Sequence, residues 1–263
     1  MGAAMTMILT DIDARGVATV TLNRPEIHNA FNDEVISGLT TIFRDLGANP
    51  TVRIVVLRGA GKSFSAGGDL NWMRRMAGYS REQNLTDAIG LATMLRTLNE
   101  LPKPTLAVIH GHCFAGAVGL VAACDIAIAA DPVQFALTEV RLGLIPATIG
   151  PYVVAAMGAR ACRRYFLTAE RFGVADAHRL GLVHEVVGLD DLDAAAERHI
   201  ENLLLAGPTA LGAAKDLIRA VDGPVTDAMV ADTAARIADA RSGEEGREGL
   251  SAFFDKRKPG WVK

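Results

Sequence analysis

The sequence predicts an α/β core followed by a helical C-terminal segment. Apolar segments rich in β-branched residues alternate with segments of helical spacing up to about residue 187. Beyond that point only Ala- and Leu-rich helical spacing remains. Half of the 263 residues are hydrophobic, which is enough for a sizeable core. Strand–helix alternation that gives way to helices is typical of an α/β core with an attached helical subdomain. We therefore expect a core at 1–190 and a helical subdomain at 191–263.

The individual elements of the core follow from alternation, capping residues and prolines. Alternation predicts the first strand, Asn32 is suited to cap the first helix, and Ser80 is suited to cap the longest one. Pro102 and Pro104 separate that helix from the next strand. Strands are expected at 16–22, 53–57, 104–109, 125–129 and 135–137, and helices at 33–46, 80–101 and from about 116. In the C-terminal segment, helices are expected at 192–205, 208–221, 225–240 and 243–257.

Composition excludes several classes of function. The net charge of −3 and the short basic clusters argue against a nucleic-acid partner. No apolar run reaches the length of a membrane span, and the first residues do not resemble a signal peptide. The three cysteines, Cys113, Cys124 and Cys162, form neither a CxxC pair nor a metal-ligand spacing. We therefore expect a reduced, cytoplasmic protein with no metal and no tightly bound cofactor, in which Cys124 lies in the core and Cys113 could line a pocket.

Two glycine-rich runs are the most informative parts of the chain. Residues 64–70 (FSAGGDL) and 111–120 (GHCFAGAVGL) each follow an apolar segment. Glycine allows a close approach of the backbone to a ligand, and two backbone N–H groups aimed at one point form an oxyanion hole. Either run alone is more often an ordinary turn, and neither fits a phosphate-binding pattern. The pair predicts a site that activates a carbonyl group.

With these runs and several further motifs, the chain resembles the enoyl-CoA hydratase/isomerase family, also called the crotonase superfamily. The resemblance covers residues 17–258, and its motifs are LNRP at 22–25, SAGGDL at 65–70, the 111–125 segment, FALTE at 135–139, LGLIP at 142–146, GLV at 181–183 and FFDKRK at 253–258. It implies a crotonase-like spiral of strand–strand–helix turns with a C-terminal helical trimerisation region. It also implies a homotrimer or a dimer of trimers.

The resemblance further implies an acyl-CoA substrate, so that coenzyme A would be present as part of the thioester rather than as a bound cofactor. The oxyanion-hole donors would be the N–H groups of Gly68 and Gly116, and Glu139 would be the acid/base. The residues that would contact coenzyme A are Arg24, His28, Ser65, Ala66, Gly68, Asp69, Leu70, Phe253 and Lys256, the last two often reaching a neighbouring subunit.

One position departs from the family pattern. Well-known hydratases of the family hold one water between two glutamates; the second matches Glu139, but the first falls at Gly119. Glu139 alone could act as base and then as acid. Three interpretations stay open: an enoyl-CoA hydratase, an enoyl-CoA isomerase that uses one glutamate as a proton shuttle, and a non-catalytic acyl-CoA-binding protein. Other side chains considered as members of the pocket are His112, Tyr152, Trp72 and Asp69, although Asp69 is better suited to support its loop.

A finer resemblance concerns the substrate. The segments 69–76, 151–154 and 163–172 look like those of bacterial methylglutaconyl-CoA and isohexenylglutaconyl-CoA hydratases, some of which also have glycine at the position of Gly119. This implies a branched, acidic acyl chain and a role in fatty-acid or branched-chain (leucine) catabolism. A carboxylated chain would require a cation in the pocket, for which Arg74, Arg75 and Arg141 are candidates.

Overall fold

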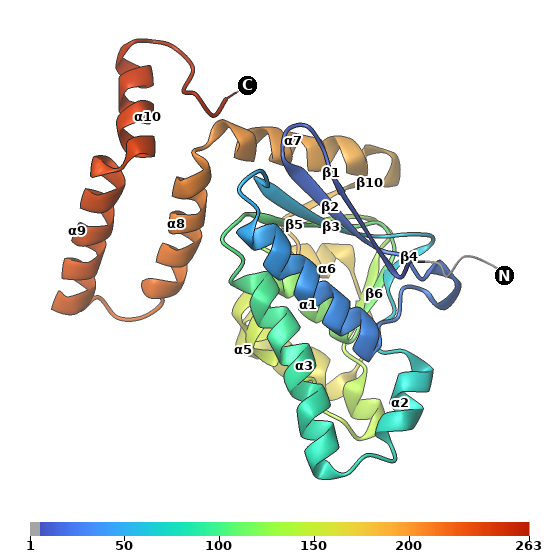
Figure 1. Ribbon diagram of the computed structural model, residues 1–263. Coiled ribbons are helices and arrows are strands. Elements are labelled where there is room, and N and C mark those ends of the chain that lie inside the picture. Colours follow the sequence, from blue (N-terminus) through green and yellow to red (C-terminus); the bar gives the residue numbers. More distant parts are fainter. Residues whose placement is uncertain (1–5, 263) are drawn as a thin grey trace.

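The computed structural model describes residues 6–262 and has two sheets, between which the chain passes repeatedly (Figure 1). The larger sheet has the order β1-β2-β3-β5-β7-β10 and is parallel except for the β1–β2 pair. The smaller sheet has the order β4-β6-β8-β9 and is parallel except for β8–β9. The strands of the larger sheet are β1 (Ile8–Ile12), β2 (Val17–Leu22), β3 (Ile54–Gly59), β5 (Thr105–Ile109), β7 (Ile126–Asp131) and β10 (Glu185–Gly188); those of the smaller sheet are β4 (Ser63–Ser65), β6 (His112–Phe114), β8 (Gln134–Ala136) and β9 (Phe172–Gly173).

Each turn of the chain contributes one strand to each sheet and then a helix. The successive pairs β3–β4, β5–β6 and β7–β8 lead into α2 (Leu70–Met76) with α3 (Arg81–Asn99), into α4 (Gly116–Ala123), and into the 3₁₀ turn η2 (Glu139–Leu142) followed by α5 (Gly150–Thr168). This confirms the expected spiral of strand–strand–helix turns.

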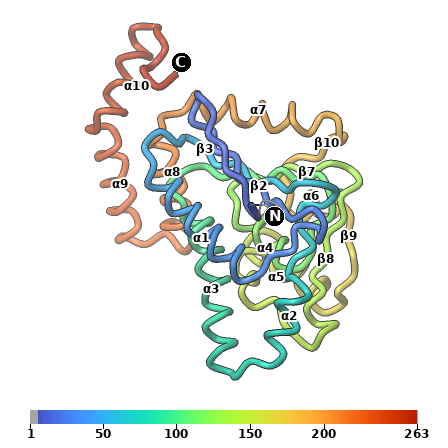
Figure 2. Tube along the Cα trace, turned by 45° about the vertical axis from the view of Figure 1, so that its right-hand side comes forward, coloured from blue at the N-terminus to red at the C-terminus, as the bar shows by residue number. Residues whose placement is uncertain are grey.

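The helices of the first half begin where the sequence places their caps. Asn32 accepts a hydrogen bond from the Val35 N–H at the start of α1 (Asp33–Ala48). Ser80 and Gln83 form a reciprocal capping box at the start of α3. The two helices pack side by side against the core (Figures 1 and 2). The N-terminal ends of α1 and α3 are therefore fixed, and this matters for the groove described below.

The C-terminal helices divide into one that packs on the core and an arm. After α6 (Val174–Arg179), α7 (Leu192–Leu205) lies against the larger sheet and buries one apolar face. The remaining helices form the arm: α8 (Pro208–Ala220) is tied to the edge of the core by an ion pair between Lys215 and Asp125 (2.8 Å), and α9 (Asp227–Ser242) and α10 (Glu244–Phe254) project from the core (Figures 1 and 2). Exposed apolar side chains on this arm are Ile218, Val225, Val230, Ile237, Leu250, Phe253 and Phe254. The division at residue 190 stays a prediction, and α7 anchors the helical segment to the core.

Two expectations about absent features can be compared with the described part of the chain. No helix in residues 6–262 is long and apolar enough to cross a membrane. In the same range, no group of three or more His, Cys, Asp or Glu side chains could hold a metal ion. All three cysteines are free thiols, and Cys113 and Cys124 are core residues as well as Cys162.

Candidate active site

The carboxyl ends of three parallel strands bring the predicted site residues to one edge of the smaller sheet. In β4, β6 and β8, Ser65 pairs with Cys113, and Cys113 pairs with Phe135. Gly68, Gly116 and Glu139 each lie a few residues beyond this row. Chain segments that leave parallel strands at the same edge form the crevice in which α/β folds bind ligands. The topology therefore gathers the three residues that the sequence analysis selected.

A parallel β-bridge to Phe31 fixes the orientation of the Gly68 amide. The Phe31 N–H donates to the Gly67 carbonyl (2.8 Å), and the Asp69 N–H donates to the Phe31 carbonyl (3.0 Å). In this parallel bridge between Phe31 and Gly68, Gly68 directs its own N–H away from Phe31. Within residues 6–262 that N–H donates to no backbone carbonyl, so it is available to a ligand.

The Gly116 amide is the first N–H of helix α4 and has no partner within the helix. The preceding residue, Ala115, has φ 50° and ψ −123°, a conformation that is uncommon outside glycine and is often found at functional sites. Ala115 is held there because its N–H donates to the Ala136 carbonyl (2.7 Å). A Cβ built on Gly67 would lie 3.5 Å from the Gly116 nitrogen, so the two glycine loops are in contact.

Phe31 connects the two loops and was not selected from the sequence. Its backbone forms the bridge to Gly68, and its buried ring lies under Gly116, where a Cβ would approach the ring to 2.6 Å. One residue thus fixes the relative position of both candidate donors. It also explains why glycine is required at 116, because any side chain there would displace the ring.

Glu139 supplies a partly buried carboxylate beside these loops. It opens η2, and its Oε2 atom is inaccessible to solvent and has no hydrogen-bond partner. Burial raises the pKa of this carboxyl above its ordinary value, and a hydrogen bond from its own backbone N–H partly opposes the shift. An unpaired buried carboxylate is costly in a folded protein, and such a group in a cleft is a candidate acid/base.

The position of the first family glutamate is filled by a neighbouring side chain. A Cβ on Gly119 would lie 2.2 Å from Cγ2 and 2.7 Å from Cβ of Ile149. Ile149 is 1% exposed and precedes the first turn of α5. No carboxylate can enter at residue 119 unless Ile149 moves or is replaced. Residue 119 therefore supplies no carboxylate, and Ile149 is a second residue that sequence reasoning missed.

The predicted coenzyme A residues near the loops are largely engaged within the protein. Arg24 forms an ion pair with Asp69 (2.9 Å), and Asp69 also accepts hydrogen bonds from the N–H groups of Asn71 and Trp72 at the start of α2. Asp69 thus supports its loop, as expected. Ser65 is completely buried and its hydroxyl donates to the Asn29 carbonyl, so its side chain faces the protein interior rather than a ligand.

Other predicted contact residues retain accessible surface. Leu70 is 70% exposed, Ala66 is half-buried, and His28 is exposed with its Nδ1 atom 3.1 Å from the Ser63 hydroxyl. Phe253 lies in the last turn of α10 and Lys256 follows it, and Figure 1 shows α10 on the other side of the molecule from β4 and β6, the strands that lead into the glycine loops. They could reach such a site only on another copy of the protein.

The further candidates for the pocket have different positions. Trp72 is buried beside Gly68, as expected for a member of the site. His112 is exposed at the start of β6, where its ring stacks on Phe114, and it lies away from the carboxyl edge. Tyr152 is half-buried, and burial raises its pKa, with the charges of Glu100 and Arg96 near its hydroxyl. Cys113 is 0% exposed, so the expectation that it could line a pocket is wrong.

The three candidate arginines also differ. Arg75 pairs with Asp33 (2.6 Å), and Arg74 binds the Asn71 side chain (2.9 Å), both on the exposed face of α2. Arg141 lies in η2, the same turn as Glu139, and forms no ion pair within residues 6–262. Of the three, Arg141 is nearest in the chain to the carboxylate.

A family model described as enoyl-CoA hydratase/isomerase matches residues 13–263. The chain belongs to this family. An enoyl-CoA hydratase structure from Shewanella pealeana is 44% identical, covers 98% of this chain and 96% of its own, and has a TM-score of 0.95. AtuE of Pseudomonas aeruginosa is 36% identical over 98% of this chain and all of its own, with a TM-score of 0.94. An enoyl-CoA hydratase from Mycobacterium smegmatis is 33% identical, with coverage of 98% and 100% and a TM-score of 0.92. These similarities confirm the crotonase fold along the whole chain.

Membership of the enoyl-CoA hydratase/isomerase family implies an acyl-CoA thioester as the substrate class. Two hollows on the surface, of about 730 and 550 Å³, include none of Gly68, Gly116 and Glu139 in their walls.

Proposed function

We propose that the protein is an enoyl-CoA hydratase that adds water across the α,β-double bond of an acyl-CoA thioester. The observation that carries this proposal is the combination of two backbone amides without a backbone partner, at Gly68 and Gly116, with a partly buried carboxylate, at Glu139, whose Oε2 atom has no hydrogen-bond partner. Full-length relatives described as enoyl-CoA hydratases support it.

The reaction uses the carboxylate twice. Glu139 takes a proton from water as the oxygen adds to C3, and the electron pair of the double bond moves toward the thioester oxygen. The resulting enolate oxygen carries negative charge, which the two amides stabilise more strongly than they stabilise the neutral carbonyl. The Glu139 carboxylic acid then returns a proton to C2, so one water has been added and the carboxylate is restored.

The environment of Glu139 suits this double role. A carboxyl group with a pKa raised toward the operating pH is a stronger base when ionised and remains a competent acid when protonated. Because Ile149 occupies the space of a second carboxylate, Glu139 performs both proton transfers without a carboxylate partner at residue 119.

Turnover in H₂¹⁸O tests the proposal, with crotonyl-CoA and 3-methylglutaconyl-CoA as parallel substrates and mass spectrometry as the readout. We expect a gain of one labelled water, and a loss of at least about 10²-fold in kcat for Glu139→Gln, the usual range for a general acid–base. Addition of water at an undiminished rate by Glu139→Gln would overturn the assignment of Glu139. No addition to any member of an enoyl-CoA panel would overturn hydration itself.

Isomerisation is the second candidate, and the filled space at Gly119 favours it specifically. One carboxylate is sufficient to move a proton between C2 and C4, whereas a second is normally associated with holding water. Deuterium exchange at C2 and C4 without addition of water would identify an isomerase. Tight binding of acyl-CoA with neither reaction would identify a binding protein.

The acyl chain is proposed to be branched and to end in a carboxylate. Arg141 supports this, because it shares a turn with Glu139, has no ion pair among the described residues, and is followed by the exposed apolar residues Leu142, Leu144 and Ile145. Such a substrate would place the protein in branched-chain or fatty-acid catabolism. Arg141→Met should lower kcat/KM for 3-methylglutaconyl-CoA more than for crotonyl-CoA; an equal effect on both would remove Arg141 from substrate selection.

Assembly into trimers, or into dimers of trimers, is proposed from the arm. Its exposed apolar side chains form a large uncovered surface, and Phe253 and Lys256 are too remote to meet coenzyme A on their own chain. Light scattering tests this by comparing the mass of the wild type with that of the Phe253→Ser, Phe254→Ser double variant. We expect a trimer or hexamer for the wild type and a smaller mass for the variant, and a monomeric wild type would exclude the assembly. The three buried free thiols support the proposed reducing, cytoplasmic setting.

A further inference from the structure

We propose that Trp72, anchored by Asp87, is a positioning residue that holds the Gly68 amide at the angle needed to bind the thioester oxygen. This inference rests on the proposed role of Gly68 in the oxyanion hole. It also links the groove between α1 and α3, whose wall includes Asp87, to the rate of the reaction.

The first step is the contact between Trp72 and the glycine. A Cβ built on Gly68 would lie 3.6 Å from Cζ3 of Trp72 and 3.6 Å from Sδ of Met73, so the indole forms, together with Met73, the wall that faces this glycine. Trp72 is 5% exposed and cannot move without displacing its neighbours. Phe31 holds Gly68 through the backbone bridge, and Trp72 provides the opposing surface.

The second step is the hydrogen bond that fixes the indole. Trp72 Nε1 donates to Oδ1 of Asp87 at 3.0 Å. A buried indole N–H without a partner would cost about 1–3 kcal/mol, so this bond determines how the ring lies. Asp87 belongs to α3, whereas Trp72 belongs to the short helix α2. The bond therefore fastens α2, and with it the adjacent glycine loop, to the long helix.

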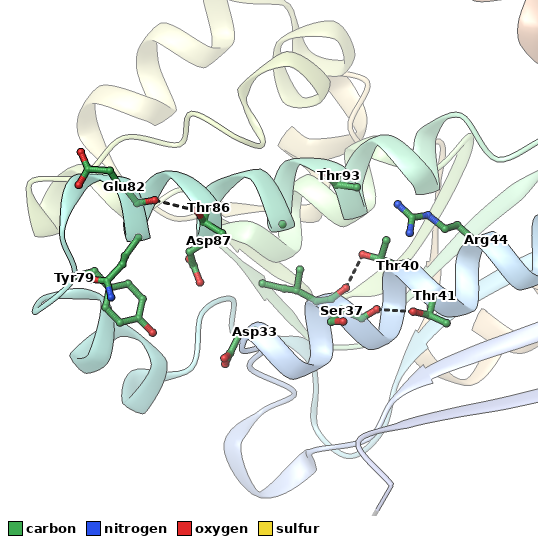
Figure 3. A pocket seen from close by; sticks show the side chains of 13 residues that line it. Asp33, Ser37, Thr40, Thr41, Arg44, Tyr79, Glu82, Thr86, Asp87 and Thr93 are labelled. Atoms are coloured by element: carbon green, nitrogen blue, oxygen red, sulfur yellow. Dashed lines mark hydrogen bonds between the residues drawn. The ribbon is translucent and has the colours of Figure 1, made fainter.

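The third step concerns the surroundings of Asp87. It lies in the wall of a groove of about 730 Å³ between α1 and α3, and Figure 3 shows its side chain extending from α3 toward α1. Burial raises the pKa of Asp87, and the indole bond and the charge of Arg75 oppose that rise. Through its hydrogen bond to Trp72, this carboxyl group is linked to the helix that follows the Gly68 loop.

The experiment compares Trp72→Phe, Asp87→Leu and Asp87→Asn with the wild type. The first two remove the hydrogen bond, whereas the amide oxygen of Asn can still accept it. A lost oxyanion donor costs about 10²–10³ in kcat, and misalignment should cost part of that, about tenfold. We expect that loss in kcat for Trp72→Phe and Asp87→Leu, with KM changed less than about twofold. Asp87→Asn should recover most of the rate.

A spectroscopic readout separates positioning from general damage to the fold. Cinnamoyl-CoA bound to each variant, in a Glu139→Gln background, should show a smaller red shift of its absorption band when the amide is misaligned, because the shift reports polarisation of the thioester. Glu82→Gln, which removes another carboxylate from the same groove, is the matched control and should retain the full shift.

Two results would overturn the inference. One is a full red shift and wild-type kcat in Trp72→Phe. The other is an equal loss for Asp87→Asn and Asp87→Leu, which would mean that the hydrogen bond is not what matters. The band shift does not depend on turnover. A protein that fails to hydrate any substrate, yet shows the shift and its loss on substitution, would disprove the proposed function while leaving the positioning role intact.

Discussion

Replacing Gly119 by alanine should destabilise the protein, and removing the Ile149 side chain should reverse the sign of that effect. Alanine in place of glycine within a helix ordinarily stabilises by about 0.5–1 kcal/mol. Here the added Cβ would lie 2.2 Å from Cγ2 and 2.7 Å from Cβ of Ile149. Overpacking of a buried site costs about 1–3 kcal/mol, which exceeds the gain in helix propensity.

The replacement chosen at 149 decides how much of the conflict is removed. Ile149→Ala eliminates the 2.2 Å contact but leaves the Cβ at 2.7 Å, still too close. Ile149→Gly leaves only Cα, at 3.5 Å, which is ordinary contact. In the Ile149→Gly background, Gly119→Ala should therefore stabilise by about 1 kcal/mol. The coupling free energy between the two substitutions should equal the overpacking cost, about 1–3 kcal/mol, and it should be smaller when alanine is used at 149.

Urea unfolding at fixed protein concentration measures this cycle, because unchanged m-values allow the midpoints to be read as stability. The reasoning is refuted if Gly119→Ala in the wild-type background is as stable as the parent, or if the two substitutions are simply additive. The same pair permits a test of function. Gly119→Glu with Ile149→Gly would introduce a second carboxylate, and its rate with crotonyl-CoA would show whether one carboxylate limits hydration.

Four further outcomes are expected. Glu139→Gln should raise the melting temperature at neutral pH. Because folding raises the pKa of this carboxyl, the group stabilises the folded state at low pH and this contribution is lost as the pH rises through the folded pKa, so the advantage of Gln should shrink in acid. Equal melting temperatures of the two proteins at pH 7 would contradict the prediction. By the same reasoning, kcat of the wild type should fall as pH falls through a value above 4.5, and a flat acid limb would exclude a carboxylate base. Gly68→Ala should keep the wild-type kcat, since the added Cβ would meet nothing closer than 3.6 Å. Gly116→Ala should lower kcat at least about tenfold, because the added Cβ would displace the ring of Phe31. Equal kcat values for the two variants would refute the steric argument. Asp69→Ala should be less stable than Asp69→Asn by about 0.5–2 kcal/mol, because only Asn preserves the cap of α2, and equal urea midpoints would count against that role.

The features that sequence predicted well are those set by local chemistry. The start of α1 at Asn32 and that of α3 at Ser80 were expected because a cap acts on its own helix. Both glycine runs were recognised for the same reason, since a turn between strand and helix has a local composition. Helix α5 was not predicted, because Pro151 and Gly158 interrupt its pattern; Gly158 has φ 76° and kinks the helix. Strand β1 was also missed, since most of its side chains are exposed.

What sequence could not supply are contacts between distant residues. Ile149 and Gly119 are separated along the chain, and nothing in either segment indicates that one fills the space of the other. The double role of Phe31 depends equally on the closing of the spiral. The roles of Gly68, Gly116 and Glu139 stay predictions of the family resemblance. The position of Cys113 was misjudged, because alternation in a strand of three residues is too short to reveal which face is buried.

The architecture also bears on the order in which the parts of the chain can fold during translation. The larger sheet is complete once β10 ends at Gly188, and the burial of α7 follows directly. Helices α8 and α9 contribute no buried residue, and α10 contributes only Ala252. Domains fold from the N-terminus during synthesis. The part of the chain that carries both glycine loops and the carboxylate can therefore close during translation, before the last helices have been made, and the arm emerges onto a core that is already formed.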